Sequence, residues 1–562
     1  MQLRHTRDTG RSQSDRTSPV SHGYQTRQCL GLAPKPLFFP AWLLFCAVLL
    51  SGCMLVGPDF EEPQAPATAD WIETEDPRLK RETADYGAWW TVFNDPVLDT
   101  LVEEARQQNL TLQIAGLRML EARAALGIAT GNIYPQLQQA SAEISLNDLS
   151  QNAPNQAGAD RFFYNYQVGF DAAWEFDFWG RFRRGVESAN ASLLASVADY
   201  NDFLVTLTSE VARTYVVIRT FEERLDVARK NVEIQKRSLQ IATVRFRNGA
   251  TTELDVQEAK TLLLSTQAQI PALQIGLRQT KNALSVLLGI PPREVEARLS
   301  GSGFIPTPPP DAAIGIPADL LRRRPDIRRA EFDAATQSAL IGVAKSELYP
   351  RFTLFGSIGL QSSDKGGLIS NNANFSDLFD TDSITYFLGP SFQWPILNYG
   401  RLKNKVRVQD ARLQQLIVNY QDTVLRAYQE VEDGLVGFLR SQEQVGLLNK
   451  SVDAAKRSVA LSLAQYRDGA ITYNRVLDAQ QALLAQQDNV TSRRGDIATH
   501  LIAVYKALGG GWQLARAADV VPEATKKTMR ARTHWGKLLA PEALDQPPPA
   551  EAARKVFPRP DW

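Results

Sequence analysis

The stretches "FRNGA" (246–250) and "YRDGA" (466–470) lie 220 positions apart, and each closes a run of 68 residues without proline. A helix of 68 residues would be about 100 Å long at roughly 1.5 Å per residue, far longer than an ordinary globular helix. Because glycine just past a periodic run takes the left-handed conformation that ends a helix, Gly249 and Gly469 are predicted helix ends. Each stretch is therefore interpreted as the tip of a helical hairpin, with returning helices over 253–288 and 473–508.

The same offset relates other landmarks of the two halves. It pairs Trp174 with Trp394, "WGR" with "YGR", Glu210-Val211 with Glu430-Val431, and Leu288-Gly289 with Leu508-Gly509. Upstream the offset falls to 215, where "YPQL" (134–137) matches "YPRF" (349–352). Two units of about 190 residues are too long for solenoid repeats, so they indicate one internal duplication.

Apolar residues in the first long run follow a coiled-coil spacing. They recur at alternating steps of four and three, at Leu193, Val197, Tyr200, Leu204, Leu207 and Val211. This spacing predicts a seam packed against neighbouring helices, with long helices over 181–248 and 401–468. The rest of the surface is charged or amide-rich, so these helices are expected to lie in water. Pro271 is expected to kink or split the first returning helix, because it removes a hydrogen-bond donor and clashes with the preceding turn.

Between each Tyr-Pro and Gly-Arg pair the apolar period changes to two. Val168, Phe170, Ala172 and Trp174 alternate with mostly polar neighbours, and the second half repeats the pattern. Each half thus offers a β-hairpin, over 136–177 and 351–396, with strands of the length of a transmembrane hairpin. A soluble hairpin that covers a core fits the same alternation, so both interpretations stay open.

Four strands cannot close a membrane barrel by themselves. About eight are the fewest that closed membrane barrels use, and each unpaired backbone group in hydrocarbon costs several kcal/mol. If the strands span a membrane, the chain must therefore oligomerise. Three copies would give twelve strands and, continuing below them, a ring of long helices.

The N-terminus has the pattern of a lipoprotein signal peptide. The 14 apolar-biased residues 37–50 are too short to span a bilayer but suit a signal-peptide core. "LSGC" (50–53) places two small residues before Cys53, which would become the acylated first residue of the mature protein. The alternative is a plain membrane anchor with a chance cysteine.

Composition excludes several classes of protein. The formal net charge of the 562 residues is zero, which gives no electrostatic reason to expect nucleic acid as a partner. Only Cys53 would remain in the mature chain, beside two histidines, so disulfides, a Cys/His metal cluster and a Ser-His-Asp arrangement are not expected. The arginine cluster 322–329 is interleaved with acids and is interpreted as a salt-bridged helix start, with a phosphate-binding patch as the alternative.

The chain resembles the TolC-like family of outer-membrane efflux ducts, in the lipoprotein branch (NodT-type) that serves resistance-nodulation-division pumps. The motifs are "CMLVGPDFEEP" after the lipidation site, "WW" (89–90), "RRRPDIRRAE" (322–331), both Tyr-Pro and Gly-Arg pairs, both tips and "ALGGGW" (507–512). The resemblance implies a mainly α-helical homotrimer, with four strands per chain closing a 12-strand β-barrel in the outer membrane and a 12-helix α-barrel crossing the periplasm. It implies no catalysis and no cofactor.

The expected organisation follows from these landmarks. It comprises a signal peptide (1–52), a lipid-anchored equatorial segment (53–97), a first repeat (98–305), a second repeat (306–512) and a tail (513–562). The tail contains "QPPPAEAARK" and is predicted to be largely disordered or wrapped on the surface. "GGGW" (509–512) has no strand before it and is expected to end the last helix, not to bind phosphate.

The resemblance also assigns site residues. The tips would face a periplasmic adaptor protein, through Arg247, Asn248, Gly249, Ala250, Thr251, Arg467, Asp468, Gly469, Ala470 and Ile471. Asp478 would constrict the periplasmic aperture, and Arg475 stands one turn earlier, where some relatives have a second acid. These two residues could pair with each other, bridge between protomers, or form an ordinary pair on the helix surface.

The sequence thus predicts the passive outer-membrane exit duct of a tripartite efflux pump in a Gram-negative bacterium. Its partners would be an adaptor, an inner-membrane resistance-nodulation-division pump and outer-membrane lipid. Two other functions stay open: the exit duct of a type I protein secretion system, and a periplasmic coiled-coil scaffold anchored by Cys53.

Overall fold

A computed structural model describes residues 55–66, 68, 70–81, 86–152, 160–300, 303–315, 323–365, 373–513 and 520–540. These residues fall within one of two compact units of the chain, Met54–Trp562. The predicted signal peptide and Cys53 lie outside the described residues.

Two helices of 67 residues dominate the fold, α4 (Arg181–Arg247) and α9 (Arg401–Arg467), as the proline-free runs predict. Each returns as a second long helix, α5 (Glu253–Leu288) or α10 (Tyr473–Ala507). The shorter elements are η1 (Trp89–Phe93), α2 (Pro96–Gln108), α3 (Leu110–Gly131), η2 (Pro292–Glu294), α6 (Val295–Arg298), α8 (Pro325–Ser346), η3 (Phe375–Phe379), η4 (Thr381–Ser383) and α11 (Glu523–Arg532).

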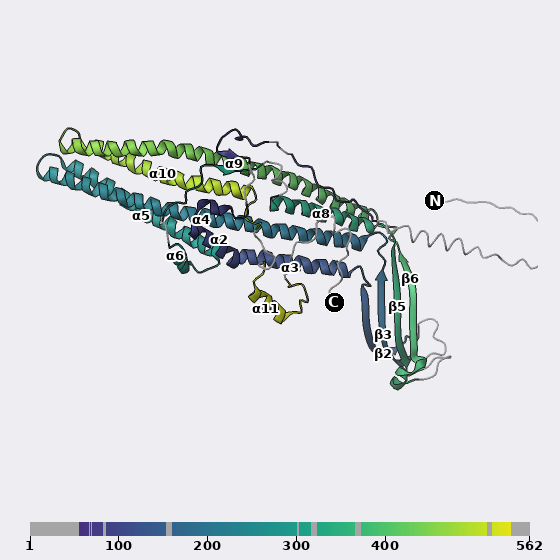
Figure 1. Cartoon of the computed structure of the whole chain (residues 1–562). Helices are drawn as coiled ribbons and strands as arrows, with labels where there is room; N and C mark the ends of the chain where they lie inside the picture. The colour runs from purple at the N-terminus through teal and green to yellow at the C-terminus, as the bar shows by residue number, and fades with distance from the viewer. Residues whose placement is uncertain are drawn as a thin grey trace, which may run out of the picture. The chain divides into compact units, whose positions relative to one another are not determined.

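The helices pack side by side around α4. This helix contacts α3, α5, α8 and α10, while α9 contacts α8 and α10 (Figure 1). Five of the six predicted seam residues are buried and Val197 is half-buried, which confirms the seam. Helix α5 runs unbroken through Pro271, so of the two expected outcomes, a kink or a split, the split is wrong. None of the described helices is both long enough and apolar enough to span a bilayer.

The four strands form one antiparallel sheet at the end of the helices opposite the tips (Figure 1). Their order is β2 (Leu137–Asp148), β3 (Phe162–Glu175), β5 (Arg351–Ser363), β6 (Ile384–Gln393). The register pairs Phe170 with both Ala140 and Ile358, and Ile358 with Tyr386. Since side chains alternate along a strand, this register gathers apolar residues on one face and mostly polar residues on the other. A separate parallel pair joins β1 (Leu79–Lys80) to β4 (Ala312–Ala313).

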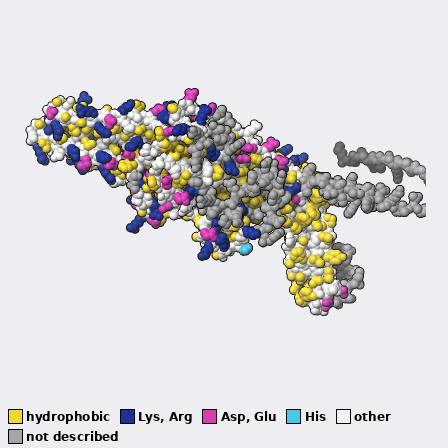
Figure 2. Space-filling model, viewed as in Figure 1, with side chains coloured by type: hydrophobic (Ala, Val, Ile, Leu, Met, Phe, Trp, Pro, Cys, Tyr) yellow, Lys and Arg dark blue, Asp and Glu magenta, His cyan; other side chains and the backbone are white. Residues whose placement is uncertain are grey.

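Most of the apolar face of this sheet is exposed and forms the apolar surface over the strands in Figure 2, although Phe375 of η3 packs on Tyr166 of β3 at 5.3 Å between ring centroids. Ile144 is 68% exposed, Leu388 72% and Tyr386 80%. A soluble hairpin would bury these side chains against a core. The interpretation of the hairpins as a cover for a soluble core is therefore wrong.

The main core lies midway along the helices, where chain segments far apart in sequence meet. Trp89 is 1% exposed and stacks on Tyr505 of α10 at 5.5 Å between ring centroids. A Cβ on Gly510 would lie 2.8 Å from the Trp89 ring, so this close packing requires glycine there. Helix α10 ends just before Gly509, which has φ +70°, so the predicted helix end is confirmed.

Part of the C-terminal tail belongs to this core. Val520 and Val521 are buried, and Met529 of α11 packs against the same cluster. Of the two alternatives for the tail, the disordered one is therefore wrong for 520–540, since this mostly exposed segment is docked on the helices by a few buried side chains. The physical reason is that apolar side chains at a few positions of this polar segment are enough to dock it. "QPPPAEAARK" lies outside the described residues.

The arginine cluster is a salt-bridged helix start, as predicted. Arg324 precedes α8 and pairs with Asp326 at 2.7 Å and with Glu430 of α9 at 2.8 Å. Arg329 pairs with Asp199 of α4 at 2.5 Å. These pairs fix α8 between the two long helices.

Candidate functional site at the helical tips

Both long helices end in the same hydrogen-bonded turn. Gly249 and Gly469 have φ of +69° and +73°, the left-handed region that glycine adopts most readily. The amide of Ala250 donates to the carbonyl of Arg245, and that of Ala470 to Gln465, both at 2.8 Å. This turn satisfies carbonyls that a helix end would otherwise leave unpaired, so it ends each long helix at a fixed residue.

Arg245 joins the two tips. Its guanidinium donates to the carbonyl oxygens of Tyr466 and Arg467 at the end of α9, and at 3.2 Å to that of Ala250 in its own tip. The guanidinium also lies 4.8 Å from the centroid of the Tyr466 ring. A cation at a helix C-terminus interacts favourably with the partial negative charge there, so Arg245 caps the neighbouring hairpin.

A second link joins the same two hairpins, with its donor on the second hairpin and its acceptor on the first. The Tyr466 hydroxyl donates to the Asp255 carboxylate of α5 at 2.8 Å, and the Thr251 hydroxyl donates to the same oxygen. Burial, together with the hydrogen bond to Asp255, raises the pKa of Tyr466 to about 12. The hydroxyl therefore keeps its proton at physiological pH and stays a donor.

These polar links surround a small apolar cluster. Tyr466 and Tyr473 are 2% and 1% exposed, and their rings meet edge to face at 5.3 Å. They pack with Ala242, Ala259 and Val476. Residues of all four long helices thus form one small core near the tips, separate from the main core, so the tips are held together by their own local contacts.

The predicted adaptor-facing residues lie at the ends of the hairpins (Figure 1). Those exposed are Arg247, Asn248, Gly249, Ala250, Arg467, Asp468, Gly469 and Ala470. Thr251 and Ile471 are half-buried; Thr251 bonds to Asp255, and Ile471 packs against the apolar cluster. The structure thus brings these residues together at one end of the molecule, with two turned partly inward.

The predicted aperture residues are exposed on one face of α10. Arg475 and Asp478 have no ion-pair or side-chain hydrogen-bond partner among the described residues. Of the alternatives, a pair within one chain is therefore not formed. Both charges face solvent, which leaves a bridge between protomers as the open alternative. No group of His, Cys, Asp and Glu in the described residues could hold a metal ion.

Sequence reasoning missed Arg245, Asp255 and Tyr466. A signal was available, because comparing the two halves at the offset of 220 pairs Asp255 with Arg475 and Tyr466 with Phe246. These positions differ inside otherwise matching stretches. A residue that differs between two otherwise matching stretches indicates that it makes a contact in one half which the other half does not make.

The comparisons with known proteins agree with this geometry. The model of the outer membrane efflux protein family matches residues 101–290 and 316–510. Nodulation protein T of Rhizobium leguminosarum bv. trifolii is 31% identical over 472 residues, which cover 83% of this chain and 96% of that protein. The solvent efflux pump outer membrane protein SrpC of Pseudomonas putida is 31% identical over 500 residues, covering 85% and 99% of the two chains.

A solved structure has the same fold. The outer-membrane channel OprN superposes with a TM-score of 0.75 at 30% identity, over 82% of this chain and 99% of that one. The superposition covers nearly the whole of that channel, so this chain shares its architecture.

Proposed function

Because this chain belongs to the outer membrane efflux protein family, we propose that it is the exit duct of a tripartite efflux pump. It is an outer-membrane protein, and the duct would be a passive homotrimer that exports drugs or other small toxic compounds. Relatives named for solvent efflux and cation efflux support small molecules or ions as cargo.

The four-stranded sheet carries this proposal, because one of its faces is apolar, the other is polar, and its two edge strands are each paired on one side only. One face is apolar and exposed, while the other carries polar side chains such as Gln139, Gln167 and Gln361. Lipid suits the first face and a water-filled lumen the second. In the described chain β2 and β6 stand at the edges of the sheet, each with a strand on one side only.

Copies of the chain would remove these edges. In hydrocarbon each unpaired backbone group costs several kcal/mol, so β6 of one copy would pair with β2 of the next. Three copies would close twelve strands, and α3, α4, α8 and α9 of each copy would continue the wall as twelve helices. The two repeats, 98–305 and 306–512, would then be equivalent parts of that wall.

The tips would be the adaptor-binding and opening end. Exposed Arg247, Arg467 and Asp468 would contact a periplasmic adaptor, while Arg475 and Asp478 would line the aperture. Adaptor binding would separate the hairpins by breaking the Arg245 and Tyr466 links. An inner-membrane pump would supply the energy, and acylation of Cys53 would anchor each copy.

Gene deletion with complementation tests the proposal. Cells without the protein should become sensitive to dyes, detergents or antibiotics, and the purified protein should run as a stable trimer and conduct ions in planar bilayers. Normal resistance with lost export of one secreted protein would instead indicate a type I secretion duct. A monomer without conductance would contradict a duct and favour the scaffold.

A further inference from the structure

The internal repeat gives every residue of α9 a counterpart in α4. Both helices have 67 residues and start 220 positions apart, while α3 and α8 both have 22 residues and start 215 apart. In this chain α8 packs along α4. The equivalent contact for α9 would be with an α3, yet the α3 of the same chain packs on α4.

One face of α4 is covered by α8. The corresponding face of α9 is not covered by another helix among the described residues. Ala191, Ala195 and Ala198 of α4 are buried. Their counterparts in α9, Ala411, Gln415 and Val418, are all exposed, and Val418 is 54% exposed. Leu425 (51%), the counterpart of buried Val205, is exposed as well, while Val408 (48%), the counterpart of buried Ser188, lines a groove that α9 shares with α8. The repeat therefore places an uncovered, partly apolar face where its other half has a packed helix.

An ion pair between α4 and α8 fixes the register of the covered contact. Asp199 and Arg329 lie 2.5 Å apart. The two helices run antiparallel, since α4 follows strand β3 and α8 precedes strand β5. Seven residues toward the strands from Asp199 on α4 is Ser192, and seven residues toward the strands from Arg329 on α8 is Thr336. A step of seven residues keeps the same side of each helix, so Ser192 and Thr336 lie beside each other in this contact. By the repeat offsets, the counterpart of Ser192 in α9 is Arg412, and the counterpart of Thr336 in α3 is Glu121.

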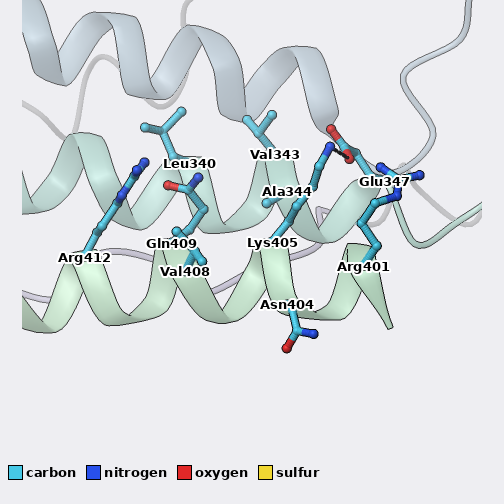
Figure 3. Close-up of a pocket in the computed structure, with 10 residues that line it drawn as sticks. All are labelled: Leu340, Val343, Ala344, Glu347, Arg401, Asn404, Lys405, Val408, Gln409 and Arg412. Carbon is cyan, nitrogen blue, oxygen red and sulfur yellow. Dashed lines mark hydrogen bonds and ion pairs between the residues drawn. The ribbon is translucent and has the colours of Figure 1, made fainter. Parts of the chain in front are cut away.

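Arg412 and Glu121 have opposite charges where their counterparts are neutral. Both side chains are exposed, and neither has an ion-pair or hydrogen-bond partner among the described residues. Arg412 borders a groove of about 640 Å³ between α8 and α9. Figure 3 shows it leaning toward α8 at one end of this groove, while Asn404, the counterpart of buried Arg184, points away from α8 toward the open flank.

We propose that a second copy of this chain lays its α3 along the open face of α9, with the partner subunit's Glu121 opposite Arg412. This inference rests on the proposed homo-oligomer and specifies its helical register. The long side chain of Arg412 turns from the groove to the open face of α9. There the carboxylate of the partner subunit's Glu121 is the ion-pair partner that Arg412 lacks among the described residues of its own chain. The apolar side chains of the open face are then covered as their α4 counterparts are.

Cysteine cross-linking in native outer membranes tests the register. The full chain with Arg412→Cys and Glu121→Cys together should give dimers and trimers with a short bis-maleimide, and each single variant should not. Asp410→Cys with Glu121→Cys is the matched control, because residue 410 lies about 160° around the helix from residue 412. It should give no product.

Charge reversal gives an independent readout. Arg412→Glu should lower the trimer-to-monomer ratio in mild detergent about two- to fivefold per contact, and adding Glu121→Arg should restore it. If the chain forms trimers, but the Arg412→Cys and Glu121→Cys pair gives no cross-link and Arg412→Glu does not change the trimer-to-monomer ratio, this register is wrong while the proposed duct stands. A wild-type chain that is monomeric in the membrane would contradict the register and the duct alike.

Discussion

Removal of one hydroxyl at the tips should weaken the link between the hairpins. Tyr466→Phe deletes the donor to Asp255 but keeps the ring, which is 2% exposed and packs against Tyr473. A hydrogen bond to a charged group contributes about 1.5–3 kcal/mol. Because Thr251 still donates to Asp255, the lower value applies, which changes the equilibrium between joined and separated tips about tenfold in each chain. Three pairs that separate together would change it about a thousandfold.

Single-channel recording in planar bilayers measures this equilibrium. Tyr466→Phe should raise the open fraction or the mean conductance above that of the wild type. The control is Tyr473→Phe, which removes the same atom from the neighbouring buried ring, whose hydroxyl has no hydrogen-bond partner in the described part of the chain. Equal conductance for Tyr466→Phe and wild type would refute the reasoning that this link holds the tips closed.

Three further predictions concern the sheet, the helices and the aperture. Leu388→Lys on the apolar face should cost about 2–4 kcal/mol at the bilayer midplane and reduce trimer in the outer membrane, whereas Phe387→Lys on the polar face should not, as immunoblots of membrane fractions can check. Burial, with neighbouring Asp326, raises the pKa of Asp202 to about 6, so the folded state holds this proton more tightly than the unfolded chain. Its contribution to stability is then lost as pH rises from about 4 to about 6, and Asp202→Asn should raise Tm in thermal melts above about pH 7 but not below about pH 4. Asp478→Ala should raise single-channel conductance; an unchanged value would remove this carboxylate from the aperture.

The fold was predictable where the sequence itself marks the end of an element. Gly249 and Gly469 close proline-free runs, and the structure ends both long helices within two residues of them. Period-two alternation likewise located the strands, although more weakly for 138–148 than for the other three. Pro271 did not split α5, because a helix held by its neighbours tolerates one lost hydrogen bond. Val521 was missed because a single docking side chain makes no periodic pattern.

The tips were predictable as a place but not as a set of contacts. The repeated stretches pointed to the exposed ends of the hairpins, whereas Arg245, Asp255 and Tyr466 act between segments more than 200 positions apart. Local pattern carries no information on such pairs. Arg475 and Asp478 do not pair within one chain, one of the alternatives, since helical spacing permits a pair on an exposed face but does not enforce it.

The central claim is that one chain provides only part of a wall through the outer membrane. Native mass spectrometry of the protein extracted from that membrane tests it most directly. The account predicts a complex of three chains that survives extraction; a single chain as the intact membrane species would contradict it.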